Sequence, residues 1–258
     1  MDPREVLTRT SDGPDAVVRY ADHADGVIDV FHPSQGHAVG PLVVLLHGGF
    51  WRQEWDRMHA RPLANALVAE GLTVAVPEYR RVGGAGGWPQ TFDDVRTVMS
   101  ALPGLLSGIG LPTDGDVVVA GHSAGGHLAL WLAGEGLDLT RVVGLAPVGD
   151  LRAAARDRLG DDATVELLGG GPEDVPDRYD AADPATRLQD RPDCQVVVVH
   201  GCEDTIVPVA NSRGLAARHP FVDLRELPGI EHFGVIDPIS EAWPTVLSAL
   251  RGEQVPLG

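Results

Sequence analysis

Short runs of apolar residues recur along the chain and end at glycine, proline or charged residues. Most of these runs are unbroken rather than alternating, which is typical of strands buried on both faces of a parallel sheet. They occupy residues 42–46, 72–76, 116–120, 142–146 and 195–199, and a last strand is expected over 222–227. Two partly alternating segments, 17–20 and 26–31, precede them and predict an antiparallel hairpin at an edge of the sheet.

Between these runs, apolar residues recur at helical spacing. The pattern predicts helices over 58–70, 92–106, 124–133 and 241–250, with the second interrupted at Pro103. Strands that alternate with helices imply a mostly parallel sheet covered by helices on both faces. The predicted fold class is therefore α/β.

Residues 150–190 break this alternation. The stretch is rich in Asp, Arg, Gly and Pro and has only short helical patches around 151–159 and 165–168. A linker between two domains is one interpretation. However, the strands before and after the stretch are expected to be neighbours in one sheet, and neither half of the chain resembles a complete domain. We therefore expect a single domain over residues 1–258, with 150–190 as a small cap or loop excursion within it.

Length and charge restrict the classes of function. A chain of 258 residues is long enough to bury a substantial core. Its formal net charge is −17, and all 20 of its cationic Lys and Arg residues are arginines. Such an acidic surface repels phosphate backbones and anionic lipids. We expect neither nucleic-acid nor membrane partners.

Cysteine usage and the absence of long apolar runs bear on location. The two cysteines, Cys194 and Cys202, flank one predicted strand and are expected to be reduced thiols. No apolar run approaches the roughly 20 residues of a membrane span, and residues 1–14 lack the apolar core of a secretory signal. The expected location is the cytoplasm.

The candidate nucleophile is Ser123, in the pentapeptide GHSAG at 121–125. This G-x-S-x-G pattern follows the predicted strand 116–120 and precedes the predicted helix 124–133. Small residues on both sides of the serine permit a tight turn that lifts the hydroxyl above the sheet edge, and the helix N-terminus favours developing negative charge. A turn of small residues without chemistry is the alternative, which the strand-turn-helix context disfavours.

A second glycine-rich segment, HGGFW at 47–51, follows the first of the unbroken apolar runs. Acyl transfer needs backbone N–H groups directed at an oxyanion, and glycine lets the main chain approach that closely. The expected donors are the N–H groups of Gly49, Phe50 and Ala124, the last of which directly follows the serine. Trp51 is expected to line the substrate pocket. A glycine turn capped by two buried aromatic residues is the structural alternative.

A serine hydroxyl needs a base, and the base needs a third group to orient it. Asp204 lies just beyond the apolar run 195–199, at the carboxyl end of a strand, where open α/β sheets place ligands and catalysis. Its neighbour Glu203, and Asp150 after the preceding strand, are alternative acids. Of the ten histidines, His232 alone lies in the loop between the last predicted strand and the last helix, so it is the expected base.

Other chemistries fit the residues less well. No pair of histidines has the helical spacing of a zinc protease, so no metal is expected. The glycines of 83–87 lack the acidic partner of a dinucleotide fingerprint, and a chain without lysine has no phosphate-loop lysine. This segment is expected to be a rim loop, and no cofactor is expected. Cys202 lies where the orienting acid is expected, which disfavours a cysteine nucleophile.

In their order and context, these segments resemble the α/β-hydrolase superfamily, and within it the small esterases and kynurenine formamidases (arylformamidases) with H-G-G-x-W in the oxyanion loop. The order Ser, Asp, His along the chain is that of α/β-hydrolases. The hormone-sensitive-lipase branch would carry a third glycine where this chain has Phe50. The resemblance covers nearly the whole chain and rests on HGGFW at 47–51, EYR at 78–80, Trp88, Pro89, Asp94, Val95, GHSAGG at 121–126, Asp204, Val207, Pro208 and His232.

The resemblance implies a serine hydrolase that cleaves a short-acyl ester or an N-formyl aryl amide through Ser123, His232, Asp204 and an acyl-enzyme. Its partner would be a small-molecule substrate, with no cofactor or metal. The bulk of Phe50 and Trp51 favours a short acyl pocket, suited to formyl or acetyl groups. A generic short-chain carboxylesterase and a non-catalytic binding module on the same fold are the alternatives. A homodimer is compatible with the sequence but does not follow from it.

Overall fold

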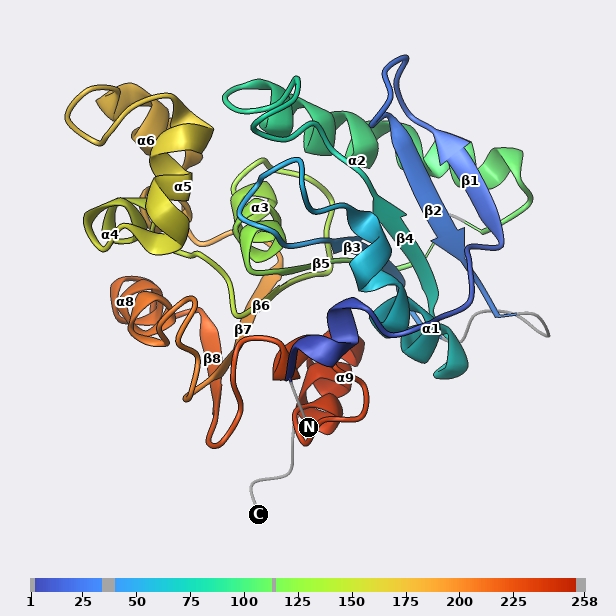
Figure 1. Cartoon of the computed structure of the whole chain (residues 1–258). Helices are drawn as coiled ribbons and strands as arrows, with labels where there is room; N and C mark the ends of the chain where they lie inside the picture. The colour runs from blue at the N-terminus through green and yellow to red at the C-terminus, as the bar shows by residue number, and fades with distance from the viewer. Residues whose placement is uncertain (1–2, 34–39, 113–114, 254–258) are drawn as a thin grey trace.

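A single twisted sheet organises the chain (Figure 1). The structure is a computed structural model that describes residues 3–33, 40–112 and 115–253. The eight strands of the described sheet lie in the order β1-β2-β4-β3-β5-β6-β7-β8. Their bounds are β1 (Ala16–Arg19), β2 (Val27–Phe31), β3 (Leu42–Leu46), β4 (Thr73–Pro77), β5 (Val117–His122), β6 (Arg141–Leu145), β7 (Gln195–Gly201) and β8 (Asp223–Leu227).

The strand pairing confirms the predicted α/β class. β1 pairs with β2, and β2 with β4, in antiparallel fashion, as expected for an N-terminal hairpin at a sheet edge. Every other pairing in the sheet is parallel. Side chains alternate between the faces, so Val44 and Leu46 pack in one core cluster while Val43 and Leu45 pack in the other. This two-sided burial is why the central strands β3 to β7 are largely apolar, whereas the edge strand β8 carries charged residues.

Helices cover both faces of the sheet (Figure 1). Apolar side chains of α2, α3 and α8 join one core cluster, and those of α1 and α9 join the other. The bounds are η1 (Pro3–Leu7), η2 (Arg57–Ala60), α1 (Arg61–Ala69), α2 (Gln90–Gly108), α3 (Ala124–Ala133), α4 (Leu151–Arg156), α5 (Leu159–Leu168), α6 (Pro176–Ala182), α7 (Pro184–Arg187), α8 (Ala210–Arg218), η3 (Gly234–Ile236) and α9 (Trp243–Arg251).

Two predicted helices differ in detail from the structure. The segment expected over 58–70 is a short 3-10 turn, η2, followed by α1. The expected interruption at Pro103 is wrong, because α2 runs through it from Gln90 to Gly108. Pro103 is on the exposed side of this helix, and burial of Val98, Leu102 and Leu106 on the other side offsets the hydrogen bond that the proline removes.

Residues 150–190 are more helical than predicted. They form α4 to α7, which follow β6 and precede β7 in the chain. In space, these helices pack against one another (Figure 1). Pro176 and Pro184 each occupy the first position of a helix, where the missing N–H costs nothing, and Asp183 caps α7 by accepting from the N–H of Ala185. β6 and β7 are parallel neighbours in the sheet, as expected.

The parallel register brings the predicted site segments together. Leu46 at the end of β3 pairs with Gly121 near the end of β5, so the loops that follow both strands start side by side. The loops after β7 and β8 begin at the same edge of the sheet.

Within the part of the chain that the structure describes, no helix combines the length and apolar character needed to cross a membrane. Both cysteines are free thiols.

Candidate active site

Ser123 occupies a strained turn between β5 and α3. Its φ of 54° and ψ of −115° lie outside the regions that an L-residue ordinarily adopts. The turn leaves no room for neighbouring side chains. A Cβ on Gly121 would lie 2.2 Å from the carbonyl oxygen of Gly125, and a Cβ on Gly125 would lie 2.2 Å from that of Leu46. The glycines of the G-x-S-x-G motif are therefore required by backbone packing, and the strain presents the hydroxyl above the sheet.

Asp204 and His232 form a buried, hydrogen-bonded pair. Asp204 follows β7 and His232 follows β8, and His232 Nδ1 lies 2.6 Å from Asp204 Oδ2. The other carboxylate oxygen, Oδ1, accepts from the N–H groups of Ile206 and Val207, each at 2.8 Å. Burial alone would raise the pKa of Asp204, but hydrogen bonds from His200 and His232 outweigh it and hold the pKa well below its usual range.

The alternative acids do not contact His232. Glu203 is exposed, and Asp150 caps α4 by accepting from the N–H of Ala153 at 2.7 Å. Cys202 lies outside the candidate pocket, with its sulfur 3.7 Å from Glu226 Oε2. Among the three acids considered, the structure therefore brings only Asp204 to the histidine.

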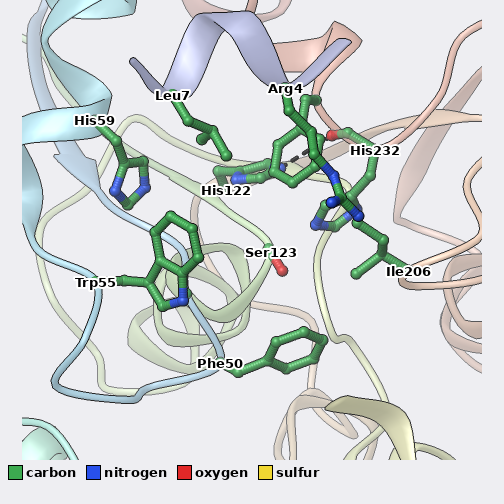
Figure 2. Close-up of a pocket in the computed structure, with 11 residues that line it drawn as sticks. Arg4, Leu7, Phe50, Trp55, His59, His122, Ser123, Ile206 and His232 are labelled. Atoms are coloured by element: carbon green, nitrogen blue, oxygen red, sulfur yellow. Dashed lines mark hydrogen bonds between the residues drawn. The ribbon is translucent and has the colours of Figure 1, made fainter. Parts of the chain in front are cut away.

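Ser123 and His232 line the same cavity, which has a volume of about 240 Å³. Figure 2 shows the Ser123 hydroxyl at its centre, with His232 on one side, Trp55 on the other and Phe50 nearby. The hydroxyl forms no hydrogen bond with any described residue. Catalytic hydrogen bonds are often absent or poorly aligned before substrate binds, because the reacting groups align only in the complex.

The HGGFW loop adopts an unusual backbone. Gly49, Phe50 and Trp51 all have positive φ, at 109°, 50° and 57°. A Cβ on Gly49 would lie 2.3 Å from Trp55 Cβ, so this glycine is needed for space as well as for its φ. The N–H groups of Gly49, Phe50 and Ala124, the expected oxyanion donors, have no hydrogen-bond acceptor among the described residues. They remain available to a ligand.

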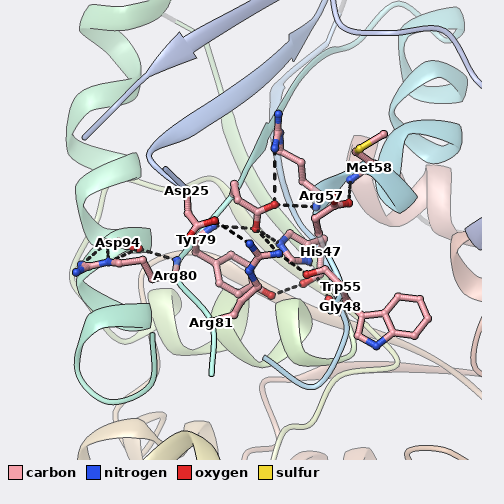
Figure 3. A network of polar contacts seen from close by, with 12 residues as sticks. Asp25, His47, Gly48, Trp55, Arg57, Met58, Tyr79, Arg80, Arg81 and Asp94 are labelled. Carbon is pink, nitrogen blue, oxygen red and sulfur yellow. Dashed lines mark hydrogen bonds and ion pairs between the residues drawn. The ribbon is translucent and has the colours of Figure 1, made fainter. Parts of the chain in front are cut away.

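A polar network beneath this loop holds it in place (Figure 3). His47 Nε2 lies 2.7 Å from Glu78 Oε1, and the His47 ring stacks on Tyr79 with centroids 4.4 Å apart. The Tyr79 hydroxyl donates to the carbonyl of His47 at 2.8 Å. Glu78 also accepts from the N–H of Arg57 and pairs with Arg81, which donates to the carbonyl of Trp55.

Glu78 is ionised in this network. Burial raises its pKa, but His47 and Arg81 act more strongly in the opposite direction and lower the pKa to about 2. In the sequence, Glu78 stands out only as the first residue of the EYR segment at 78–80 that carries part of the family resemblance. The signal that could have found its role is its position, because a carboxylate directly after a fully buried strand sits where parallel sheets gather polar groups.

Trp51 does not line the pocket, contrary to the sequence prediction. Its side chain is 1% exposed and packs edge-on against His127, with ring centroids 5.1 Å apart. The positive φ angles reverse the chain, so that Phe50 faces the cavity and Trp51 faces the core. Trp55, which lies outside the HGGFW motif, contributes the tryptophan to the cavity wall.

The cavity wall also contains two histidines, His122 and His59, for which the sequence predicted no role. His122 Nε2 donates to the carbonyl of His232 at 3.0 Å, which fixes its tautomer and ties the nucleophile turn to the base loop. Burial, reinforced by the nearby His232, lowers the pKa of His122 far below the usual value. Burial and the neighbouring His47 lower the pKa of His59 to about 4. His122 and His59 are therefore uncharged at neutral pH.

The stretch 150–190 contacts the loop that carries Phe50. A Cβ on Gly160 of α5 would lie 2.6 Å from the Phe50 ring. Arg52 bridges the same two segments, with Nε 2.8 Å from Glu166 Oε2 and Nη2 3.0 Å from the carbonyl of Asp161. The position of Phe50 in the cavity therefore depends on α5.

The described residues contain no cluster of His, Cys, Asp and Glu that could hold a metal.

A mostly parallel sheet with a strained serine turn after β5 and a histidine loop after β8 defines the α/β-hydrolase fold. The BD-FAE family model matches residues 28–218, and the chain belongs to that family. It is similar to a kynurenine formamidase of Drosophila melanogaster, with 32% identity over 106 residues that cover 40% of this chain and 32% of that protein.

Two further similarities extend over more of the chain. Esterase LipC of Mycobacterium tuberculosis is 26% identical over 248 residues, which cover 85% of this chain and 60% of LipC. The chain thus spans less than two thirds of the length of both curated relatives. The crystal structure of esterase B from Lactobacillus rhamnosis superposes with a TM-score of 0.75 at 21% identity, covering 97% of this chain and 89% of that one.

Proposed function

We propose that this protein is a serine hydrolase that cleaves short-acyl esters or N-formyl aryl amides. The observation that carries the proposal is the buried Asp204–His232 pair, 2.6 Å apart, whose histidine shares one cavity with the serine of the strained turn. The similarity to proteins named esterase and kynurenine formamidase supports both bond types.

The proposed mechanism is nucleophilic acyl transfer. Asp204 accepts the Nδ1–H of His232, which leaves Nε2 free to take the proton of Ser123. The Ser123 oxygen then attacks the substrate carbonyl, and the N–H groups of Gly49, Phe50 and Ala124 stabilise the oxyanion. His232 returns the proton to the leaving alcohol or aryl amine. Water, activated by the same histidine, hydrolyses the acyl-enzyme.

The cavity favours a short acyl group. Phe50, Trp55, Ile206 and Phe233 give it largely apolar walls, and its volume of about 240 Å³ is small for a ligand site. Residues 150–190 act as a cap that holds Phe50 in this wall, within a single domain over residues 1–258. Formyl and acetyl groups are therefore the preferred acyl groups.

The test compares kcat/KM for N-formylkynurenine, a series of p-nitrophenyl acyl esters and simple anilides. Ser123→Ala should abolish turnover, while Ser100→Ala, which changes an exposed serine of α2, should leave it unaltered. We expect acetate esters to react faster than octanoate esters. A formyl aryl amide turned over thousands of times more slowly than acetate esters would make the protein a generic carboxylesterase. Failure of a fluorophosphonate probe to modify Ser123 would make it a non-catalytic binding module.

A further inference from the structure

His200 is a fully buried histidine that the proposed mechanism does not use. It lies near the end of β7, four residues before Asp204. Its Nε2 is 2.8 Å from the carbonyl oxygen of Val207 and 3.2 Å from Asp204 Oδ2. Both partners only accept hydrogen bonds, so Nε2 carries the proton. On the other side of the ring, Nδ1 lies 2.7 Å from Ser212 Oγ.

Ser212 completes this arrangement from a different element. It is a buried residue in the first turn of α8. Both ring nitrogens of His200 are thus hydrogen-bonded, Nδ1 to the Ser212 hydroxyl and Nε2 to the carbonyl of Val207. These two bonds fix the ring so that Nε2 lies 3.2 Å from Asp204 Oδ2. A continuous polar chain therefore runs from Ser212 through His200 and Asp204 to His232.

The Asp204 carboxylate is thus restrained through contacts to both of its oxygens. Oδ1 of Asp204 accepts two backbone N–H groups, and Oδ2 faces the imidazoles of both His200 and His232. His200 also holds the carbonyl of Val207, which closes the turn that carries the carboxylate. Two motions are restricted: rotation of the carboxyl group away from His232, and movement of the turn as a whole.

We infer that His200, oriented by Ser212, is a positioning residue that holds the Asp204 carboxylate in line with His232. The inference rests on the proposed function, because it assigns His200 a role in activating Ser123. A displacement of about 1 Å in reacting groups can cost on the order of 100-fold in rate. Removal of the His200 N–H should therefore lower kcat roughly 10-fold to 100-fold. KM should change little, since His200 does not line the cavity.

The test uses two substitutions of similar size that differ in hydrogen bonding. His200→Gln retains a side-chain N–H, whereas His200→Met removes it. We expect Met to lower kcat for p-nitrophenyl acetate by roughly 10-fold to 100-fold and Gln to restore most of that loss. The rate at which a fluorophosphonate modifies Ser123 should fall in parallel, because this rate reports serine activation without substrate binding. Thermal melting should shift similarly in both variants.

His219→Met is the matched control. His219 is also a buried histidine whose Nε2 donates to a main-chain carbonyl, that of Ala185 at 3.0 Å, but it does not contact Asp204. This variant should lose stability while keeping wild-type kcat. Equal kcat values for His200→Gln and His200→Met at equal folded fraction would overturn the inference, as would a loss of kcat in His219→Met as large as that in His200→Met.

Ser212→Ala gives a second route if His200→Met does not fold. Loss of the hydroxyl frees the His200 ring to change tautomer or orientation, so kcat should fall several-fold with KM unchanged. Wild-type kcat in Ser212→Ala would overturn the role of Ser212. The inference and the proposed function fail differently. If the wild-type protein neither turns over esters nor reacts with the fluorophosphonate, the proposed function is wrong. If it does both and the variants match it, only the inference is wrong.

Discussion

The imidazole of His47 and the carboxylate of Glu78 lie 2.7 Å apart beneath the loop that carries the candidate oxyanion donors. His47 follows β3 and Glu78 follows β4, which are neighbouring parallel strands. The pair therefore joins two loops at the carboxyl edge of the sheet. It links the core to Gly49 and Phe50, only two and three residues further along the chain.

This pair predicts a stability effect of Glu78→Gln. The amide keeps the shape but removes the negative charge that faces His47, Arg57 and Arg81, which weakens the charge-assisted hydrogen bonds to this side chain. Arg57 and Arg81 keep Asp29 and Asp25 as partners, so we expect the free energy of unfolding in urea to fall by about 1–3 kcal/mol. The exposed Glu173→Gln is the control and should change it by less than about 0.5 kcal/mol. Equal unfolding midpoints for the two variants would show that the pair contributes little.

The candidate acid predicts a large kinetic effect. Asp204→Asn keeps the size of the side chain but presents an amide to His232, which favours the wrong imidazole tautomer. We expect kcat to fall by about 10³-fold to 10⁴-fold with KM little changed. Steady-state kinetics with p-nitrophenyl acetate measures this. Glu203→Gln, at an exposed neighbouring position, should retain wild-type kcat. A small effect at Asp204 together with a large one at Glu203 would reverse the assignment.

Phe50 predicts the acyl-chain preference. Phe50→Ala removes the ring from the cavity wall but keeps the backbone N–H, so the oxyanion donors remain. We expect the ratio of kcat/KM for octanoate to that for acetate to rise by about 10-fold or more, since even one methylene group in an apolar pocket is worth about 1–3 kcal/mol. Phe221→Ala, outside the pocket, should leave the ratio unchanged. An unaltered ratio in Phe50→Ala would mean that another wall limits the acyl chain.

The contribution of Asp183 to the free energy of unfolding is expected to depend on pH. Burial raises its pKa to about 6, against hydrogen bonds from the N–H groups of Leu151, Ala185 and Arg152 that lower it. The folded state therefore binds this proton more tightly than the unfolded state. The stabilising contribution is present below about pH 4 and is lost as the pH rises through about 6.

Asp183→Asn removes this titration. The free energy of unfolding of the wild type, measured relative to the variant, should fall by roughly 2–3 kcal/mol between pH 4 and pH 7. Urea unfolding of both proteins at several pH values gives the difference. Parallel curves across this range would contradict the prediction, because other titrating groups are common to both proteins.

The pattern of apolar residues determined the sheet and most of the helices. Short unbroken apolar runs are typical of strands buried on both faces of a covered parallel sheet, and the predicted strands match the observed ones to within about two residues. The prediction failed at Pro103, where burial of one helix face outweighs the local cost of proline. It also missed most of the helical structure in 150–190, because short helices without a long periodic face leave a weak signal.

The sequence by itself determined the order of the candidate groups and their position at the ends of strands. Motif spacing singled out Ser123, Asp204 and His232 as candidates, because a strand that ends at a polar residue places that residue at the sheet edge. Only the tertiary structure decided the contacts between distant segments. His232 contacts Asp204 rather than Asp150. In the same way, Glu78 contacts His47, and His200 contacts Asp204.

The side-chain directions of Trp51 and Trp55 are a further property that only the tertiary structure decided. Composition and spacing cannot tell which of Trp51 and Trp55 faces the cavity, because that depends on backbone angles. Positive φ at Phe50 and Trp51 turns one side chain outward and the next inward, and contacts from α5 and from the Glu78 network stabilise those angles. Local sequence sets which elements form, whereas side-chain direction in a strained loop is set by what packs around it.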